Sequence, residues 1–200
     1  ANAFDLWFLL GRDDRRIIEP SCHLAEPFAE GRAAVYINGK WGFIDTTGRD
    51  IRPPTYPGCG GDYSGGRAKV MVRVGKAYKY GFLNLSGRLV IPPRFEWCKG
   101  FHDGYARVVV SDSGWGIIDT TGRTVIPFVY EETRDFRDGL APVKRAGKWG
   151  YVDTTGQEVV KPQFADVALF EHGRAIVVTE AQWGFIDRRG REIVKPSFAY

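Results

Sequence analysis

The sequence predicts an all-β repeat protein in which one short unit is copied about five times. Three observations lead to this prediction. The chain of 200 residues is rich in Gly (25), Pro (11) and aromatic residues (14%) but has one Met, which is typical of short strands joined by tight turns. A Trp-Gly or Tyr-Gly pair recurs along the chain, and each pair is followed by the same kind of turn sequence.

The spacing of the aromatic-Gly pairs defines the copies. The aromatic residues of the pairs are Trp41, Tyr80, Trp115, Trp149 and Trp183, separated by steps of 39, 35, 34 and 34 residues. We assign the copies to residues 28–62, 63–100, 101–135, 136–169 and 170–200. Trp7 precedes Trp41 by 34 residues, so we interpret residues 1–27 as a degenerate N-terminal half unit that acts as a cap.

Each copy is expected to form a three-stranded meander. In the first copy, Ala33 and Val35 alternate with more polar positions, as in a strand with one buried face. Phe43 and Ile44 are both apolar, as in a central strand, and we expect the neighbouring Trp side chains to lie in the core. An Asp-Thr-Thr-Gly turn follows at residues 45–48, and the third strand ends near a proline.

The arrangement of the copies has two candidate forms. Three strands in about 34 residues are fewer than the four strands that a propeller blade typically has. We therefore favour an open, solenoid-like stack over a closed, propeller-like ring, and in either case we expect residues 1–200 to form one domain.

The pairs lie within stretches that resemble a known family. Two stretches are similar to the WG (or KWG) repeats of bacterial proteins. They are Lys-Trp-Gly-Phe-Ile-Asp-Thr-Thr-Gly at residues 40–48 and Lys-Trp-Gly-Tyr-Val-Asp-Thr-Thr-Gly at residues 148–156. The resemblance implies a bacterial interaction or envelope-associated module with no shared catalytic residues. It favours the envelope or a secreted location over the cytoplasm, although the sequence leaves the compartment unknown. Tyr80 and Asn84 depart from the Trp and Asp of the pattern.

Several classes of function find no support in the sequence. No apolar run approaches the roughly 20 residues of a membrane-spanning helix. No nucleophile, phosphate-binding or metal-ligand motif is present, so we expect no catalytic residue, no cofactor and no metal site. The Asp that recurs after each second strand is interpreted as a turn residue. Cys59 and Cys98 occupy the same position in their copies, and whether they form a disulfide stays open.

The second copy differs from the others in charge and length. Residues 63–99 carry eight Lys or Arg and a single acid, Glu96. We take the longer loop from Arg73 to Lys79 as the functional insertion, because loops tolerate added length and often carry recognition. If the copies stack in register, a basic patch with tyrosine edges results. The candidate binding residues are Arg67, Lys69, Arg73, Lys76 and Lys79, with Arg32, Tyr105 and Arg107 from neighbouring copies. A solvated face that keeps the protein soluble is the structural alternative.

The function that we predict is a non-enzymatic interaction module. Its repeat surface docks another protein, and an acidic partner would complement the basic patch. The alternative is an envelope glycan or other anionic polymer, held by aromatic and Arg rows. We do not expect nucleic acid as a partner.

Overall fold

The computed structural model describes residues 24–110, 114–180 and 182–199, and all its regular elements are β-strands. The expected N-terminal cap, with Trp7, lies mostly outside the described residues. The chain divides between Phe101 and His102 into two compact units, which is within one residue of the predicted boundary between the second and third copies. That the units fold as one domain stays a prediction, as does the choice between an open stack and a closed ring.

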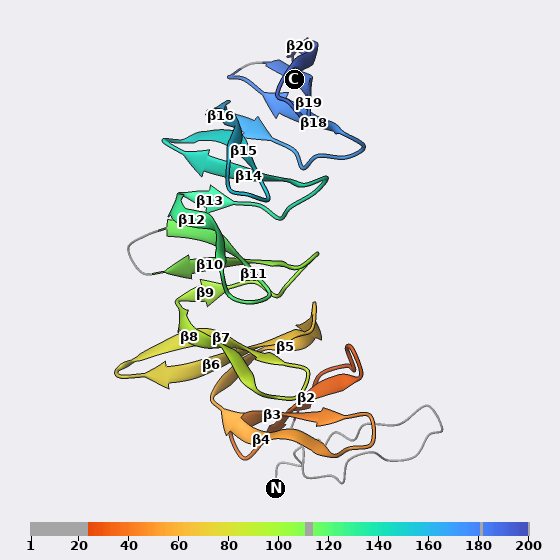
Figure 1. Cartoon of the computed structure of the whole chain (residues 1–200), viewed down its shortest axis with the longest axis vertical. Coiled ribbons are helices and arrows are strands. Elements are labelled where there is room, and N and C mark those ends of the chain that lie inside the picture. Colours follow the sequence, from red (N-terminus) through yellow and green to blue (C-terminus); the bar gives the residue numbers. More distant parts are fainter. Residues whose placement is uncertain (1–23, 111–113, 181, 200) are drawn as a thin grey trace, which may run out of the picture. The chain divides into compact units, whose positions relative to one another are not determined.

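The strands of the first unit precede His102. They are β1 (Leu24–Ala25), β2 (Arg32–Ile37), β3 (Lys40–Asp45), β4 (Asp50–Tyr56), β5 (Gly58–Ser64), β6 (Arg67–Val74), β7 (Ala77–Asn84), β8 (Leu89–Phe95) and β9 (Trp97–Cys98) (Figure 1).

The strands of the second unit follow in the same repeating order. They are β10 (Tyr105–Val110), β11 (Gly114–Asp119), β12 (Thr124–Tyr130), β13 (Glu132–Thr133), β14 (Leu140–Arg145), β15 (Lys148–Asp153), β16 (Glu158–Phe164), β17 (Asp166–Val167), β18 (Arg174–Val178), β19 (Gln182–Asp187) and β20 (Glu192–Ala199). Across the described parts of both units, no helix could cross a membrane.

The strands form five four-stranded sheets whose members are neighbours in chain order: β1–β4, β5–β8, β9–β12, β13–β16 and β17–β20. The prediction of an all-β repeat is confirmed, but three strands per copy was one too few. The additional strand is the segment just before each predicted meander, and in β9, β13 and β17 it is two residues long. Two residues are too few to show an alternating pattern, so the sequence did not reveal this strand.

The glycine of each Trp-Gly pair is required by a close backbone approach. A Cβ on Gly150 would lie 2.3 Å from the carbonyl oxygen of Val160 in β16 and 2.6 Å from the nitrogen of Pro162. The pairing of β15 with β16 changes register at this point, so β16 crosses directly over the glycine. The same Cβ-to-carbonyl distance is 2.4–2.7 Å at Gly42, Gly81, Gly116 and Gly184. The Trp-Gly motif therefore marks the place in each sheet where the neighbouring strand passes over the glycine at a β-bulge.

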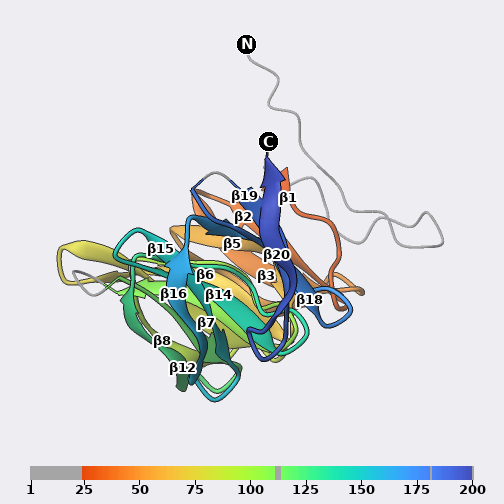
Figure 2. The same ribbon diagram turned by 90° about the horizontal axis from the view of Figure 1, so that it is seen from above.

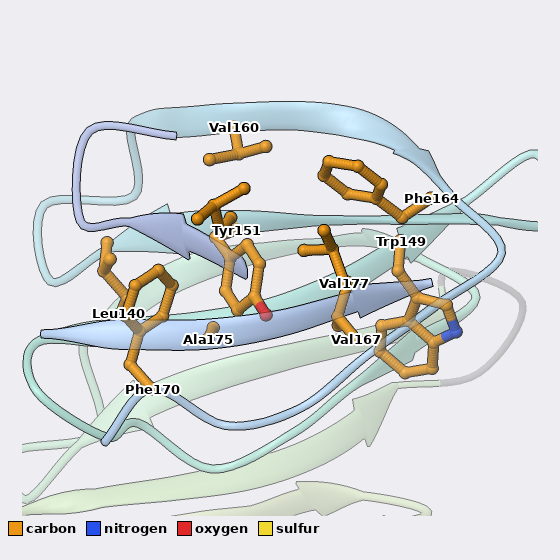
Figure 3. Close-up of a cluster of buried hydrophobic side chains, with 10 residues drawn as sticks. Leu140, Trp149, Tyr151, Val160, Phe164, Val167, Phe170, Ala175 and Val177 are labelled. Carbon is orange, nitrogen blue, oxygen red and sulfur yellow. The ribbon is translucent and has the colours of Figure 1, made fainter. Parts of the chain in front are cut away.

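Within each unit, the core lies between successive sheets. Tyr151 of β15 packs over Ala175 and Val177 of β18, and the Phe170 ring lies edge-on to it at 4.8 Å between centroids (Figure 3). In the first unit, Phe43 and Tyr63 form the same contact at 5.4 Å.

In each sheet one line of residues runs across three adjacent strands, and we call this line the packing row. Its three members lie opposite one another on adjacent strands and so point to the same face. The rows are Ala34–Phe43–Arg52, Lys69–Phe82–Ile91, Arg107–Ile117–Ile126, Pro142–Tyr151–Val160 and Ile176–Phe185–Val194.

Candidate functional site

The segment predicted to be a long loop in the second copy is an extended hairpin. Strands β6 and β7 have eight residues each, against six in the β2–β3 and β14–β15 pairs. They are joined only by Gly75 and Lys76, and Gly75 has a φ of 63°, which favours glycine. Because the strands pair as far as Val74 and Ala77, the added residues lengthen a rigid element instead of a loop. Figures 1 and 2 show this hairpin, in yellow, extending from its sheet.

The tip of this hairpin, residues 73–78, presents cations beside apolar side chains. Arg73 and Lys76 are exposed, and Arg73 Nε donates a hydrogen bond to the Gly75 carbonyl at 3.2 Å. Tyr78 is 52% exposed and Val74 46% exposed. Arg73 lies directly opposite Tyr78 in the pairing of β6 with β7, so the two side chains share one face of the hairpin. The sequence has no acid between Asp62 and Glu96, so no carboxylate within the hairpin neutralises the tip.

The other predicted basic residues of the second copy lie nearer the sheet and contact the protein itself. Lys69 Nζ donates to the Cys98 carbonyl at 3.1 Å and lies 5.4 Å from the centre of the Tyr80 ring. Lys79 pairs with Glu96 at 3.0 Å, and its side chain is 19% exposed. Arg67 donates to the Gly66 carbonyl at 2.9 Å.

The environment of Lys69 recurs elsewhere as a structural contact, which we call the cation staple. In the third sheet, Arg107 donates to the Thr133 carbonyl at 2.7 Å, pairs with Asp135 at 2.8 Å and lies 5.7 Å from the centre of the Trp115 ring. In the fourth sheet, Arg134 lies 4.1 Å from the centre of the Trp149 ring and donates to the Val167 carbonyl. Each staple joins a cation to the ring at the Trp position and to a carbonyl further along the chain.

The remaining predicted residues are also engaged in packing. Arg32 Nε donates to the Leu85 carbonyl at 3.1 Å, in the turn after β7, and its Nη1 donates to the Glu30 carbonyl at 2.7 Å. The Tyr105 ring packs on Phe136 with centroids 4.6 Å apart. The expected row of free cations across several copies is therefore not what these residues form. Of the eight candidates, Arg73 and Lys76 are the ones at the exposed tip.

The Trp side chains differ in burial between copies. Trp149 is 3% exposed, as expected for a core residue. The three equivalent residues Trp41, Trp115 and Trp183 are half-buried. The prediction that the Trp side chains lie in the core is therefore confirmed at Trp149 and wrong at these three positions, where part of each ring stays exposed. The cation staples cover part of the Trp115 and Trp149 rings, so these rings serve packing.

The recurring Asp acts as a turn residue. Asp45 Oδ1 accepts hydrogen bonds from the Thr47 hydroxyl at 2.6 Å, the Thr47 amide at 2.8 Å and the Arg49 amide at 3.1 Å. The bonds from Thr47 are the main cause of the lowered pKa of Asp45. The pKa is also lowered at Asp119, Asp153 and Asp187. Among the described residues, no group of three or more His, Cys, Asp or Glu could hold a metal ion.

Neither of the described cysteines forms a disulfide. Cys98 is buried, and burial raises the pKa of its thiol to about 12, so at neutral pH it is protonated and unreactive. Cys59 is partly buried and forms no disulfide either. The question of a disulfide between them, open from the sequence, is answered in the negative.

Sequence reasoning missed the apolar part of the hairpin tip. Val74 and Tyr78 were not among the candidate residues, although both lie inside the segment singled out for its length. The signal that could have found Tyr78 is the alternation of Met71, Arg73 and, across the turn, Tyr78 and Tyr80 on one face of a continued hairpin, while Val74 lies on the opposite face.

The repeat pattern has a direct match. The family model of the WG containing repeat matches residues 15–41, 41–73, 80–112, 115–149, 149–180 and 183–200. The chain belongs to the WG repeat family. The first match covers residues 15–27, about half of the expected cap, and shows that the repeat begins before the first complete copy. The resemblance noted from the Trp-Gly pairs is thereby confirmed.

Solved structures are similar to this WG-repeat chain at low sequence identity. The crystal structure of the eukaryotic initiation factor is 12% identical, with 85% of this chain and 52% of that chain covered and a TM-score of 0.56. Citrobacter koseri AztD is 15% identical, with 91% and 60% covered and a TM-score of 0.45. The WD40 β-propeller domain of Doa1 is 10% identical, with 84% and 66% covered and a TM-score of 0.40.

The WG-repeat chain spans about half to two thirds of the length of these structures. At 12% identity the likeness to the initiation factor concerns the fold alone. No curated protein matches the sequence.

Proposed function

We propose that this WG-repeat chain is a non-enzymatic binding module that docks an acidic protein surface through the tip of the β6–β7 hairpin. The observation that carries the proposal is the composition of the tip. Arg73 and Lys76 supply charge, while Tyr78 and Val74 expose 52% and 46% of their surface. Arginine and tyrosine are enriched at protein interfaces because they combine large contact area with hydrogen bonding.

The rigidity of the tip supports recognition of a folded partner. Every residue of the tip except Gly75 and Lys76 is paired across the hairpin. A preorganised element loses less conformational entropy on binding than a mobile loop of the same composition. The lengthened strands therefore favour binding to a folded protein surface over binding that requires a mobile loop to become ordered.

A protein partner suits this geometry better than an extended anionic polymer. A polymer would need a track of free cations along several copies, and Lys69, Arg107 and Arg32 are held by carbonyl oxygens of the protein itself. Of the eight predicted binding residues, the two exposed cations Arg73 and Lys76 lie at one tip and are mixed there with apolar side chains. Cations beside apolar side chains complement a protein surface on which carboxylates surround an apolar patch.

The proposal is tested by photo-crosslinking from the tip. Tyr78 is replaced by a photoreactive phenylalanine analogue, and the protein is crosslinked in extracts of the native organism. The same protein is prepared with the tip reversal Arg73→Glu/Lys76→Glu and with a control reversal, Arg188→Glu/Arg189→Glu. The control changes two exposed arginines in the last copy and alters net charge equally.

We expect one crosslinked protein that carries an acidic surface, is lost with the tip reversal and persists with the control reversal. A crosslinked protein that survives the tip reversal would contradict the proposal. The polymer alternative is measured separately by retention on heparin in a salt series. Steep salt dependence that both reversals weaken alike would favour polymer binding, because counterion release depends on total charge.

A further inference from the structure

An exposed indole stands in the second copy at a position where the third and fourth copies have an acid. Trp97 is the first residue of the two-residue strand β9 and is 43% exposed. The first residues of the equivalent strands β13 and β17 are Glu132 and Asp166. An indole at such a position leaves a large apolar surface in water, and its N–H adds a hydrogen-bond donor. The exposed part of Trp97 is therefore surface that a partner can cover.

Trp97 lies beside the hairpin that carries the tip. Glu96, the residue before Trp97, pairs with Lys79 of β7 at 3.0 Å, and β9 contacts β7. Lys79 in turn directly follows Tyr78, which is 52% exposed. One ion pair therefore joins the neighbour of Trp97 to the neighbour of Tyr78, and it fixes the segment that carries the indole against the hairpin.

The cation staples indicate which group a partner would supply next to Trp97. In the staple of the fourth sheet, Arg134 pairs with the carboxylate of Asp166 at 2.9 Å, and Asp166 occupies the position that Trp97 has in the second copy. Lys69, the cation of the second sheet, is held by a carbonyl and a ring and is half-buried. A partner that packs on Trp97 and carries a carboxylate would complete the staple of Lys69 in the same way.

We propose that Trp97 is the apolar anchor of the docking site at the hairpin tip, and that the acidic partner places an apolar side chain on this indole with carboxylates beside it. The inference rests on the proposed function and specifies the chemistry of the partner. Charge complementarity favours an acidic occupant, because residues 63–99 carry eight Lys or Arg and a single acid. Trp, Tyr and Arg are the residues that most often dominate binding energy at interfaces, and this copy exposes all three, at Trp97, Tyr78 and Arg73.

Two labelled peptides are the probes that test the inference. One alternates Asp and Leu, and the other has Ala in place of each Leu. Binding is followed by fluorescence anisotropy, with the WG-repeat chain titrated to a concentration on the order of 100 µM, which detects association of moderate affinity.

The repeat supplies both the test variant and its matched control. Trp97→Glu introduces the residue type that Glu132 has at the equivalent position. The control is Leu24→Glu, which makes the same change in charge. Leu24 is the first residue of β1, the equivalent position in the first sheet, and is 48% exposed.

We expect Trp97→Glu to bind the Asp-Leu peptide about tenfold or more weakly than Leu24→Glu does, as is typical for the loss of an aromatic anchor. The two variants should bind the Asp-Ala peptide equally, because only their equal change in charge then matters. The tip reversal Arg73→Glu/Lys76→Glu should weaken the binding of both peptides. An unchanged thermal unfolding of Trp97→Glu shows that this variant is folded.

Equal binding of the Asp-Leu peptide by the two Glu variants would overturn the inference, and so would an unmodified chain that does not bind this peptide. If the tip reversal weakens both peptides and Trp97→Glu matches its control, the anchor is wrong and the proposed function stands. If the tip reversal changes neither peptide while Trp97→Glu weakens the Asp-Leu peptide, docking through the tip is wrong.

Discussion

The fourth and second sheets share one frame and use it differently. In the β13–β16 sheet, Trp149 is 3% exposed and lies under Arg134 at 4.1 Å and Lys144 at 5.7 Å. In the β5–β8 sheet, the same position holds Tyr80, which is half-buried beside Lys69 at 5.4 Å. The glycine crossing and the turn are the same in both sheets. The comparison shows that the four-stranded sheet depends on the backbone contacts at the glycine and the turn. The residue at the Trp position and the length of the hairpin can vary.

The largest expected difference between the two sheets is at the aromatic position. Trp149→Ala removes a buried indole and its cation staple, and we expect a loss of about 3–5 kcal/mol in the free energy of unfolding. Tyr80→Ala should lose less, because the Tyr80 ring is already partly in water. Urea unfolding of both variants measures the difference. Equal losses, or a loss below about 1 kcal/mol for Trp149→Ala, would break the comparison.

The shared frame predicts equal effects at the glycines. In Gly150→Ala and Gly81→Ala, the new methyl would meet a backbone carbonyl at 2.3 Å and 2.6 Å, which no rotamer can relieve. We expect each to cost about 1–3 kcal/mol or more. Gly100→Ala is the control, because its Cβ would meet only Ser64 Cβ at 3.8 Å. Thermal unfolding of the three variants checks the order, and a neutral Gly81→Ala would show that the second sheet lacks the common crossing.

The cation staples should differ in strength between the sheets. Arg134 contacts the Trp149 ring, the Val167 carbonyl and the Asp166 carboxylate at 2.9 Å, so Arg134→Ala should cost about 1.5–3 kcal/mol. Lys69→Ala removes one carbonyl contact and a more distant ring, and the loss should be smaller. Chemical denaturation gives both values. If Lys69→Ala cost as much as Arg134→Ala, the staples would be equivalent despite their geometry.

The smallest expected difference between the two sheets is in how the stability of the fold depends on acidic pH. Hydrogen bonds, led by that from the Thr155 hydroxyl, hold the pKa of Asp153 below its usual 3.8. A carboxyl with a lowered folded-state pKa stabilises the fold above its unfolded pKa, and this contribution is lost as the pH falls through the folded pKa. The second sheet has Asn84 at this position, with the same three bonds to its Oδ1, so it has no such carboxyl.

Exchanging these two residues tests the acid effect in both directions. Asp153→Asn should weaken the loss of stability between pH 5 and pH 3, and Asn84→Asp should strengthen it, by a fraction of a kcal/mol each because both sites are exposed. Urea midpoints at the two pH values measure the change. An unchanged pH dependence in both variants would show that the turn does not couple to acid stability.

The sequence by itself was sufficient for the features that repeat locally. The spacing of the Trp-Gly pairs, the apolar pair at Phe43 and Ile44, and the Asp turn all lie within a few residues of their partners, so each appears as a pattern in the chain. The family assignment depends on the same local pattern.

Only the tertiary structure decided which side chains are free to bind. Lys69 and Arg107 look like surface cations in the sequence, but the carbonyls that hold them lie 29 and 26 residues further along the chain. Val74 and Tyr78 are exposed because the hairpin continues past the edge of its sheet. Ile176 in the last sheet is 40% exposed, whereas Tyr151 and Val160 of the fourth sheet are buried beneath β18. Whether a side chain is buried depends on which other part of the protein packs against it, and the local sequence pattern does not predict that contact.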